Sequence, residues 1–211
     1  MNTILLQPAY FAPIIQYATI AQAKAVVFEV HDNYQKQSYR NRFKIATATG
    51  VLSLTIPILH RVDKTARHQT TNEVRIENQF KWQRNHWRSL KTAYQTSPYF
   101  EYYEDDLEPL YHMEWDTLSA FHEGCNAFVM ECLQIEVPTS NSTEYFRTPT
   151  AQKDLRFLID SKSKRDYPLP EYNQLFAENH GYLKNMSVLD LLFNQGPNAI
   201  TYLEKVDLSA L

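Results

Sequence analysis

The strongest constraint on the fold is a strand–helix–strand pattern close to the N-terminus. Thr3–Leu6 is a short apolar run that ends at Gln7 and Pro8, and Ala25–Phe28 is a second run of the same kind. Pro13 lies between them, where a helix can begin because proline suits the first helical turn, and apolar residues follow it at helical spacing. The pattern predicts a βαβ unit, and so an α/β fold with a parallel strand pair.

A β-hairpin is predicted between residues 34 and 58, with its turn at Thr49 and Gly50. Its second arm alternates apolar and polar residues, so one face of that arm should be buried. Helical spacing then predicts helices over residues 79–96 and 116–134. We expect one domain over residues 1–211 with a mixed sheet, in which residues 1–78 form mainly sheet and residues 79–211 are mainly helical.

Composition removes several classes of protein. The chain has only four glycines, and their positions allow neither of the common phosphate-binding loops nor a nucleophile elbow. Lys and Arg number 21 against 24 Asp and Glu, a balance that does not favour binding to nucleic acid. No apolar run is long enough for a membrane span, and no basic segment precedes the apolar N-terminal residues. We expect a cytoplasmic protein.

Cysteines and histidines offer few ligands. Cys125 and Cys132 both lie on the apolar stripe of the helix predicted over residues 116–134, so we expect two buried thiols and no disulfide framework. His60 and His68 have no third ligand near them in the sequence, and we therefore expect no metal site.

Polar side chains follow both strands of the predicted βαβ unit. These residues are Gln7, Tyr10, His31, Asp32 and Asn33. Ligands of open α/β sheets bind beyond the carboxyl ends of the strands, so this edge is a candidate site. The alternative is ordinary loop chemistry, because Asp-Asn is a common turn pair.

A row of basic residues precedes and enters the first arm of the hairpin. If that arm is extended, Lys36, Arg40, Arg42 and Lys44 share one face, while the side chains of Tyr39 and Asn41 point with the apolar residues Phe43 and Ile45. One interpretation is an anion site for phosphate or carboxylate, with arginine as the bidentate partner. The other is a solvated strand face. Asn41 should be buried and hydrogen-bonded.

One histidine stands out. His86 lies between Trp82 and Tyr94 on the same predicted helix face. It is either a hydrogen-bonded core residue or a general base, because the unperturbed pKa of histidine lies near 6.5.

Several separate segments together resemble the WbqC-like family of bacteria. They are Gln7 to Pro13, Gln35 to Arg42, Leu54 to Pro57, Trp82 with His86 and Tyr94, Ser97 to Tyr103, and Ser187 to Pro197. Many members begin with His-Gln-Pro, where this chain has Leu6-Gln7-Pro8, and an acidic pair commonly precedes the Lys segment, where this chain has His31-Asp32. Asp32 is therefore the acid expected at that point.

The resemblance implies a role with surface-polysaccharide (O-antigen) gene clusters and transfer of glycine or a similar acyl group onto a sugar. We therefore expect an aminoacyl or acyl transferase acting on a nucleotide sugar or glycan precursor. The rival expectation is a non-catalytic sugar- or nucleotide-binding partner in a glycan assembly complex. The resemblance assigns no cofactor, and the oligomeric state stays open.

Roles for individual residues complete the hypothesis. Asp32 or His86 would be the catalytic base. The substrate-binding residues would be Gln7, Tyr10, Lys36, Tyr39, Arg40, Asn41 and Arg42. We expect Gln7, Asp32, His86 and at least one of Arg40 and Arg42 to line one concave pocket.

Overall fold

The computed structural model describes residues 2–59 and 69–211, and it confirms the α/β class. Four parallel strands form the main sheet in the order β5-β2-β1-β6. Their bounds are β1 Thr3–Leu6, β2 Ala25–Phe28, β5 Thr139–Asn141 and β6 Lys153–Asp154. The two edge strands come from the half of the chain that the sequence predicted to be mainly helical, because segments of two or three residues carry no readable alternation.

The predicted βαβ unit is present, and it sets the position of the candidate site. Helix α1, Ile14–Ala21, starts directly after Pro13 and connects the two central strands. Leu6, the last residue of β1, pairs with Phe28, the last residue of β2. The segments that follow both strands therefore leave the sheet at the same edge.

The hairpin forms a sheet of its own and does not join the parallel sheet. Its strands are β3, Arg42–Thr47, and β4, Gly50–Thr55, and its turn lies one residue earlier than predicted, at Ala48 and Thr49. Strand β3 packs against helices α2 and α6. Burial of its apolar side chains by helices explains why the hairpin needs no pairing with the main sheet.

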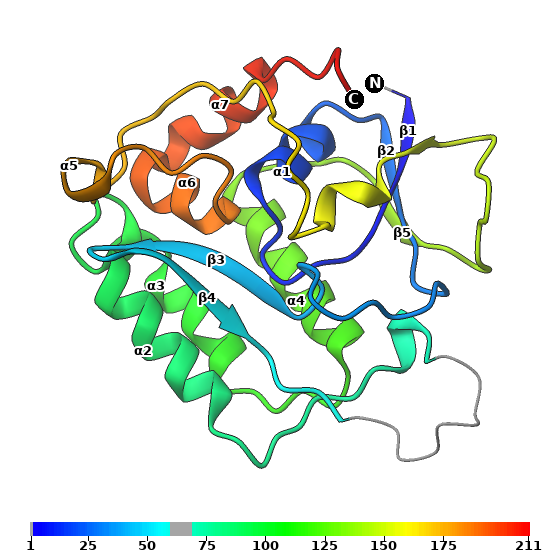
Figure 1. The fold of residues 1–211 in the computed structure, drawn as a ribbon, viewed down its shortest axis with the longest axis horizontal. Coiled ribbons are helices and arrows are strands. Elements are labelled where there is room, and N and C mark those ends of the chain that lie inside the picture. The colour runs from blue at the N-terminus through cyan, green and yellow to red at the C-terminus, as the bar shows by residue number, and fades with distance from the viewer. Residues whose placement is uncertain (1, 60–68) are drawn as a thin grey trace.

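The other regular elements of the described chain are helices and 3-10 turns. The α-helices after the hairpin are α2 Trp82–Tyr94, α3 Phe100–Leu107, α4 Leu118–Cys132, α5 Ala177–His180, α6 Val188–Gln195 and α7 Ala199–Lys205. Short 3-10 turns are Thr71–Glu73, Glu108–Tyr111, Arg156–Ile159 and Gly196–Asn198. Figure 1 shows the parallel strands on one side of the molecule and the hairpin with α2 and α3 on the other, with α4 running between them.

Aromatic rings fill the space between the hairpin, α2 and α4. The Tyr10 ring contacts Phe43 of β3 and Phe121 of α4, at centroid distances of 4.3 and 5.1 Å. Cys125 of α4 is fully buried there, as predicted. The prediction is wrong for Cys132, which is only half-buried because it is the last residue of α4 and lies beside a surface cavity.

Candidate functional site

Asp32 is the centre of a buried polar cluster at the carboxyl ends of β1 and β2. Arg40 Nη2 lies 2.5 Å from Asp32 Oδ2, and Gln7 Nε2 donates to the same oxygen over 2.9 Å. The hydroxyl of Thr71 donates to Asp32 Oδ1 over 2.5 Å. Gln7 directly follows β1 and Asp32 comes shortly after β2, so the parallel register of these strands brings the two side chains together.

Burial sets the electrostatics of this cluster. The side chains of Arg40 and Asp32 are only 4% and 9% exposed. Removal from water lowers the pKa of the Arg40 guanidinium, and the Asp32 carboxylate beside it opposes that shift. Two opposite charges out of water are tolerated when they are paired and hydrogen-bonded, and this carboxylate has a donor on each of its oxygens.

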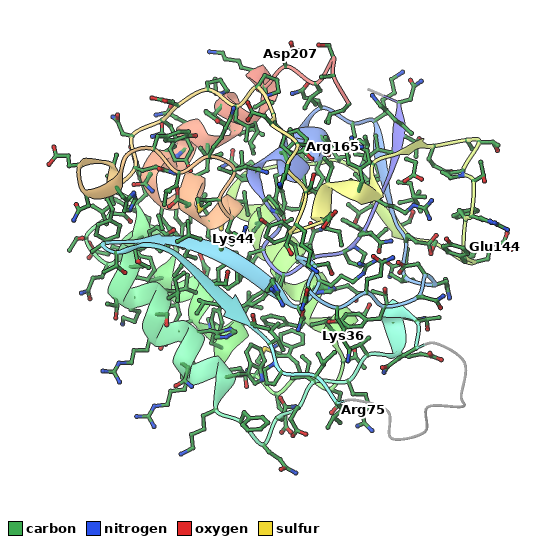
Figure 2. The ribbon with its side chains drawn as sticks, viewed as in Figure 1. Lys36, Lys44, Arg75, Glu144, Arg165 and Asp207 are labelled. Carbon is green, nitrogen blue, oxygen red and sulfur yellow. The ribbon has the colours of Figure 1, made fainter. Side chains whose placement is uncertain are left out.

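A concave pocket of about 490 Å³ opens over this cluster, and we call it the Arg40 pocket. Its lining residues are Gln7, Asp32, Gln35, Lys36, Gln37, Ser38, Arg40, Tyr145, Arg156, Phe157, Ile159, Asp160 and Lys162. Of the four residues that the sequence placed in one pocket, Gln7, Asp32 and Arg40 are here, joined by Lys36. Lys36, labelled in Figure 2, belongs to the segment between β2 and β3.

The charges in the Arg40 pocket are unequally paired. Arg40 is neutralised by Asp32, and Arg156 binds both carboxylate oxygens of Asp154 at 2.6 and 2.9 Å. Lys36 and Lys162 are exposed and have no ion-pair partner among the described residues, and the same holds for Asp160. The two ammonium groups outnumber this one carboxylate, so the pocket keeps an excess of positive charge for a ligand.

Two buried polar atoms of the cluster also lack partners. Gln7 Oε1 and Arg40 Nε are enclosed and make no hydrogen bond within the described parts of the chain. Such groups are uncommon in proteins, because an unpaired buried donor or acceptor is costly. Their place next to the pocket suits a site that a ligand or ordered water completes.

His86 lies elsewhere, and the expectation that it lines this pocket is wrong. Its Nδ1 is 3.0 Å from the hydroxyl of Tyr10, which in turn is 2.9 Å from the hydroxyl of Tyr111. Burial lowers the pKa of His86 to about 4, so its ring is neutral near pH 7. His86 lies on the buried, apolar face of α2, so its ring points into the aromatic core. Tyr10 is fully buried beside it and is likewise absent from the pocket lining.

The remaining predicted residues lie in the core, in a small cavity beside the Arg40 pocket, and at the start of β3. Asn41 is buried and donates to the carbonyl of Ile56 over 2.9 Å, as predicted. Tyr39 lines a neighbouring cavity together with Lys44. Arg42 is the first residue of β3 and is half-buried, whereas Lys36 and Arg40 precede that strand. The predicted row of cations on one strand face is therefore wrong, because the chain is not extended before residue 42.

Thr71 of the buried cluster and two cations of the pocket, Arg156 and Lys162, were not singled out from the sequence. Thr71 belongs to a short 3-10 turn, and Arg156 and Lys162 follow β6 on the far edge of the sheet. The one local signal was a single arginine within an apolar run, Leu155 to Ile159. Sequence spacing does not reveal that β6 pairs with β1, which is what brings this segment to Gln7.

Metal ligands do not cluster in the described ranges, 2–59 and 69–211. No group of three or more His, Cys, Asp or Glu side chains there could hold a metal ion. His60 and His68 lie outside the described residues. None of the described helices is long and apolar enough to cross a membrane.

Comparisons with known proteins find one family and a relative. The sequence profile of the WbqC-like protein family matches residues 7–166. The uncharacterized protein Rv1507c of Mycobacterium tuberculosis is 30% identical over 208 residues, which cover 83% of this chain and 87% of the relative. No solved structure matches the chain. The segment matched by the family profile contains every residue that lines the Arg40 pocket.

Proposed function

The chain belongs to the WbqC-like protein family, and we propose that it binds a nucleotide sugar or glycan precursor through a phosphate or carboxylate in the Arg40 pocket. One observation carries the proposal. Lys36 and Lys162 are unpaired among the described residues, and both face a polar pocket at the carboxyl ends of parallel strands, where α/β sheets bind ligands. Two ammonium groups without carboxylate partners are a ready site for an anion.

The buried pair supports this role indirectly. Asp32 fixes the guanidinium of Arg40, so that Arg40 Nε stands enclosed and unpartnered beside the pocket. A fixed guanidinium loses little conformational entropy when a ligand binds. Gln7 is held by its bond to Asp32, and its own Oε1 is likewise enclosed beside the pocket without a hydrogen-bond partner among the described residues.

The finer activity that we propose for this site is aminoacyl or acyl transfer to the bound ligand. An amine or hydroxyl of the acceptor attacks the carbonyl carbon of the acyl donor, the donor's leaving group departs, and the acceptor's proton passes to a base. Of the two candidate bases, Asp32 and His86, only Asp32 lines the pocket.

The contacts of Asp32 favour non-catalytic binding as the alternative. Its carboxylate accepts hydrogen bonds from Gln7, Arg40 and Thr71, and accepting a proton would weaken them. That arrangement favours a positioning role for the carboxylate, which holds Arg40 in place, over a role in proton transfer. A polysaccharide role, in either form, is the substrate context that we propose from family membership.

Binding is tested by thermal shift with inorganic phosphate, a set of nucleotide sugars and a set of acyl-CoA thioesters. We expect the strongest ligand to raise the melting temperature, and Lys36→Met or Lys162→Met to lose most of that rise. Lys164→Met is the matched control, because Lys164 is exposed nearby but lies outside the pocket lining. The proposal fails if no anion stabilises the protein, or if both pocket variants keep the full shift.

Catalysis is tested separately by mass spectrometry. The protein is incubated with its strongest nucleotide-sugar ligand and an acyl-CoA or aminoacyl donor, and the acylated product is measured. Turnover that Asp32→Asn abolishes, in a variant that is still folded at the assay temperature, supports the transferase. Ligand stabilisation without turnover on any donor supports the non-catalytic binder.

A further inference from the structure

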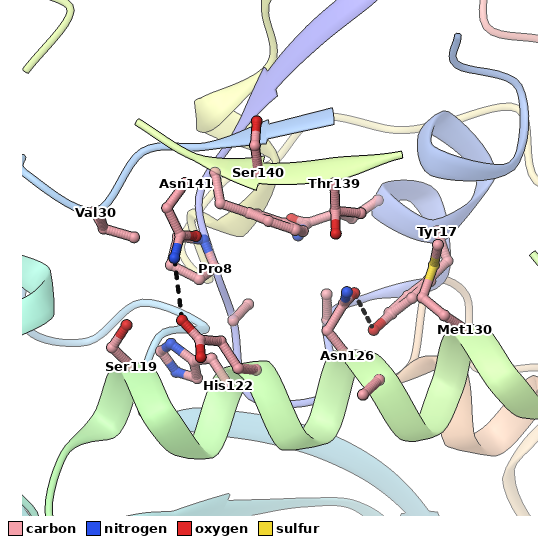
Figure 3. A pocket seen from close by; sticks show the side chains of 16 residues that line it. Pro8, Tyr17, Val30, Ser119, His122, Asn126, Met130, Thr139, Ser140 and Asn141 are labelled. Carbon is pink, nitrogen blue, oxygen red and sulfur yellow. Dashed lines mark hydrogen bonds between the residues drawn. The ribbon is translucent and has the colours of Figure 1, made fainter. Parts of the chain in front are cut away.

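A second cavity, distinct from the Arg40 pocket, lies between α4 and the β2–β5 side of the sheet. Its volume is about 380 Å³, which falls in the range of about 300–1,000 Å³ typical of small-molecule sites. Figure 3 shows His122 and Asn126 of α4 on one side and Thr139–Asn141 of β5 opposite them. We call it the His122 cavity. It shares no described lining residue with the Arg40 pocket.

The contacts of His122 determine its tautomer. His122 Nε2 is 2.5 Å from the backbone carbonyl of Arg40, and a carbonyl can only accept, so Nε2 carries the hydrogen. In the neutral ring Nδ1 then carries a lone pair. Burial lowers the pKa of His122 to about 4, which agrees with a neutral ring near pH 7. Nδ1 is therefore a hydrogen-bond acceptor, and it is enclosed without a partner among the described residues.

Gln16 of α1 carries a second buried acceptor that has no donor among the described residues. Its Nε2 donates to the backbone carbonyl of Gln7 over 3.0 Å, which fixes the orientation of the amide. Its Oε1 is enclosed and lacks a donor within the described chain. Gln16 and His122 are each only 2% exposed, and both line the cavity. Two enclosed acceptors, one on α1 and one on α4, thus belong to cavity-lining residues and lack donors among the described residues.

The rest of the lining offers an anion no opposite charge. Seven of the other fourteen lining residues are apolar, namely Pro8, Ala9, Ala12, Phe28, Val30, Ala127 and Met130. The polar ones, apart from Glu123, are the neutral residues Tyr17, Ser119, Asn126, Thr139, Ser140 and Asn141. Neither Lys nor Arg occurs among the described lining residues, and the exposed carboxylate of Glu123 lies at the cavity, where Asn141 donates to it over 3.0 Å. An anion would meet two acceptors and a negative charge here, with no cation to compensate.

We propose that the His122 cavity is a binding site for a small, non-anionic molecule that presents N–H or O–H donors from a partly apolar body. A primary amine fits best, because an ammonium group has three donors and no acceptor, and Glu123 supplies the opposite charge. An alcohol of the same skeleton has a single O–H donor and no charge, so it serves one of the two buried acceptors and gains nothing from Glu123. This site rests on residues other than those of the proposed function and stands or falls independently of it.

The test uses benzylamine, benzyl alcohol and benzoate, which share one ring and differ in donor count and charge. Binding is measured on the full chain by two-dimensional ¹H–¹⁵N NMR titration, with the ring nitrogens of His122 as a local reporter. We expect benzylamine and benzyl alcohol to shift the His122 Nδ1 resonance, benzylamine to bind several-fold more tightly than the alcohol, and benzoate to leave it unchanged.

Three variants make the result specific to this cavity. Ala127→Phe fills the cavity from an exposed position of α4 and should weaken both ligands at least tenfold; Ser119→Leu narrows it in the first turn of α4 if the first variant folds poorly. Glu123→Gln should weaken benzylamine several-fold and leave benzyl alcohol unchanged. Glu131→Gln is the matched control, an exposed glutamate of the same helix that does not line the cavity, and it should change neither.

Three outcomes would overturn the proposal. They are benzoate binding as tightly as benzylamine, full binding retained in both cavity-filling variants, and no His122 response to any of the three compounds at millimolar concentration. The last result would mean that ordered water alone satisfies the two acceptors, as it does in many buried polar cavities.

Discussion

Replacing Arg40 with methionine isolates the contribution of the buried ion pair. Methionine has a flexible, unbranched apolar side chain, and the substitution removes the cation that lies 2.5 Å from Asp32. The carboxylate, only 9% exposed, keeps its hydrogen bonds from Gln7 and Thr71 but loses its counter-charge. It becomes an uncompensated charge in the interior.

The expected loss is large. Removing one partner of a buried pair costs about 3–5 kcal/mol, and the two remaining hydrogen bonds place this case near the lower end, at about 3 kcal/mol. For a chain of this size each kcal/mol lowers the melting temperature by about 2–4 °C, so Arg40→Met should melt about 6–12 °C lower. The double variant Asp32→Leu/Arg40→Met should recover at least half of the loss, because an apolar replacement of both partners is often close to neutral.

Urea unfolding followed by circular dichroism at pH 7 measures these free energies, with linear extrapolation to water. Arg84→Met, a substitution at an exposed position of α2, is the control and should change stability by less than about 0.5 kcal/mol. A loss below about 1 kcal/mol for Arg40→Met would refute the reasoning. So would a double variant as unstable as the sum of the two single variants, because the pair would then have no coupling to lose.

Three further predictions concern other parts of the molecule. Burial holds the pKa of His86 and His122 at about 4, below the ordinary 6.5. Between these two pH values the unfolded chain binds more protons than the folded chain, so the free energy of unfolding should be highest above pH 6.5 and fall towards pH 4. The expected loss at pH 5 is about 2 kcal/mol per histidine. Urea unfolding from pH 5 to 8 checks this, and His86→Gln should flatten the fall; an unchanged slope contradicts it. Gly196→Ala should destabilise the protein well beyond Gly181→Ala, because both glycines have positive φ but only at Gly196 would a Cβ lie 2.4 Å from the Tyr99 ring; equal melting temperatures would contradict the clash. The pKa of Cys132 is raised to about 12, mainly by burial, so Ellman's reagent should label it slowly at pH 7 in the native protein, and rapid labelling would show a reactive thiolate.

Local sequence patterns predicted helices and strands well where one face of the element is buried and the element is long enough for its hydrophobic pattern to repeat. Both central strands were predicted with their observed bounds, and α2 was found within three residues at either end of the predicted range 79–96. The same rule failed before residue 42, where an assumed extended register placed Arg40 in one row with Lys36, Arg42 and Lys44, on the face opposite Phe43 and Ile45. The structure buries it, because the counter-charge that makes its burial tolerable lies eight residues earlier in a loop.

The sequence by itself determined that Gln7 and Asp32 meet, because two short apolar runs joined by a helix form parallel neighbours whose carboxyl ends share one edge. It also determined the burial of Cys125 through simple helical periodicity. Tertiary structure alone decided which cations join that edge and which histidines do not. Lys162 is brought to that edge by the pairing of the two-residue strand β6 with β1, and His86 points into the aromatic core instead. Neither could be predicted, because pairing and packing between distant segments leave no periodic pattern in the sequence.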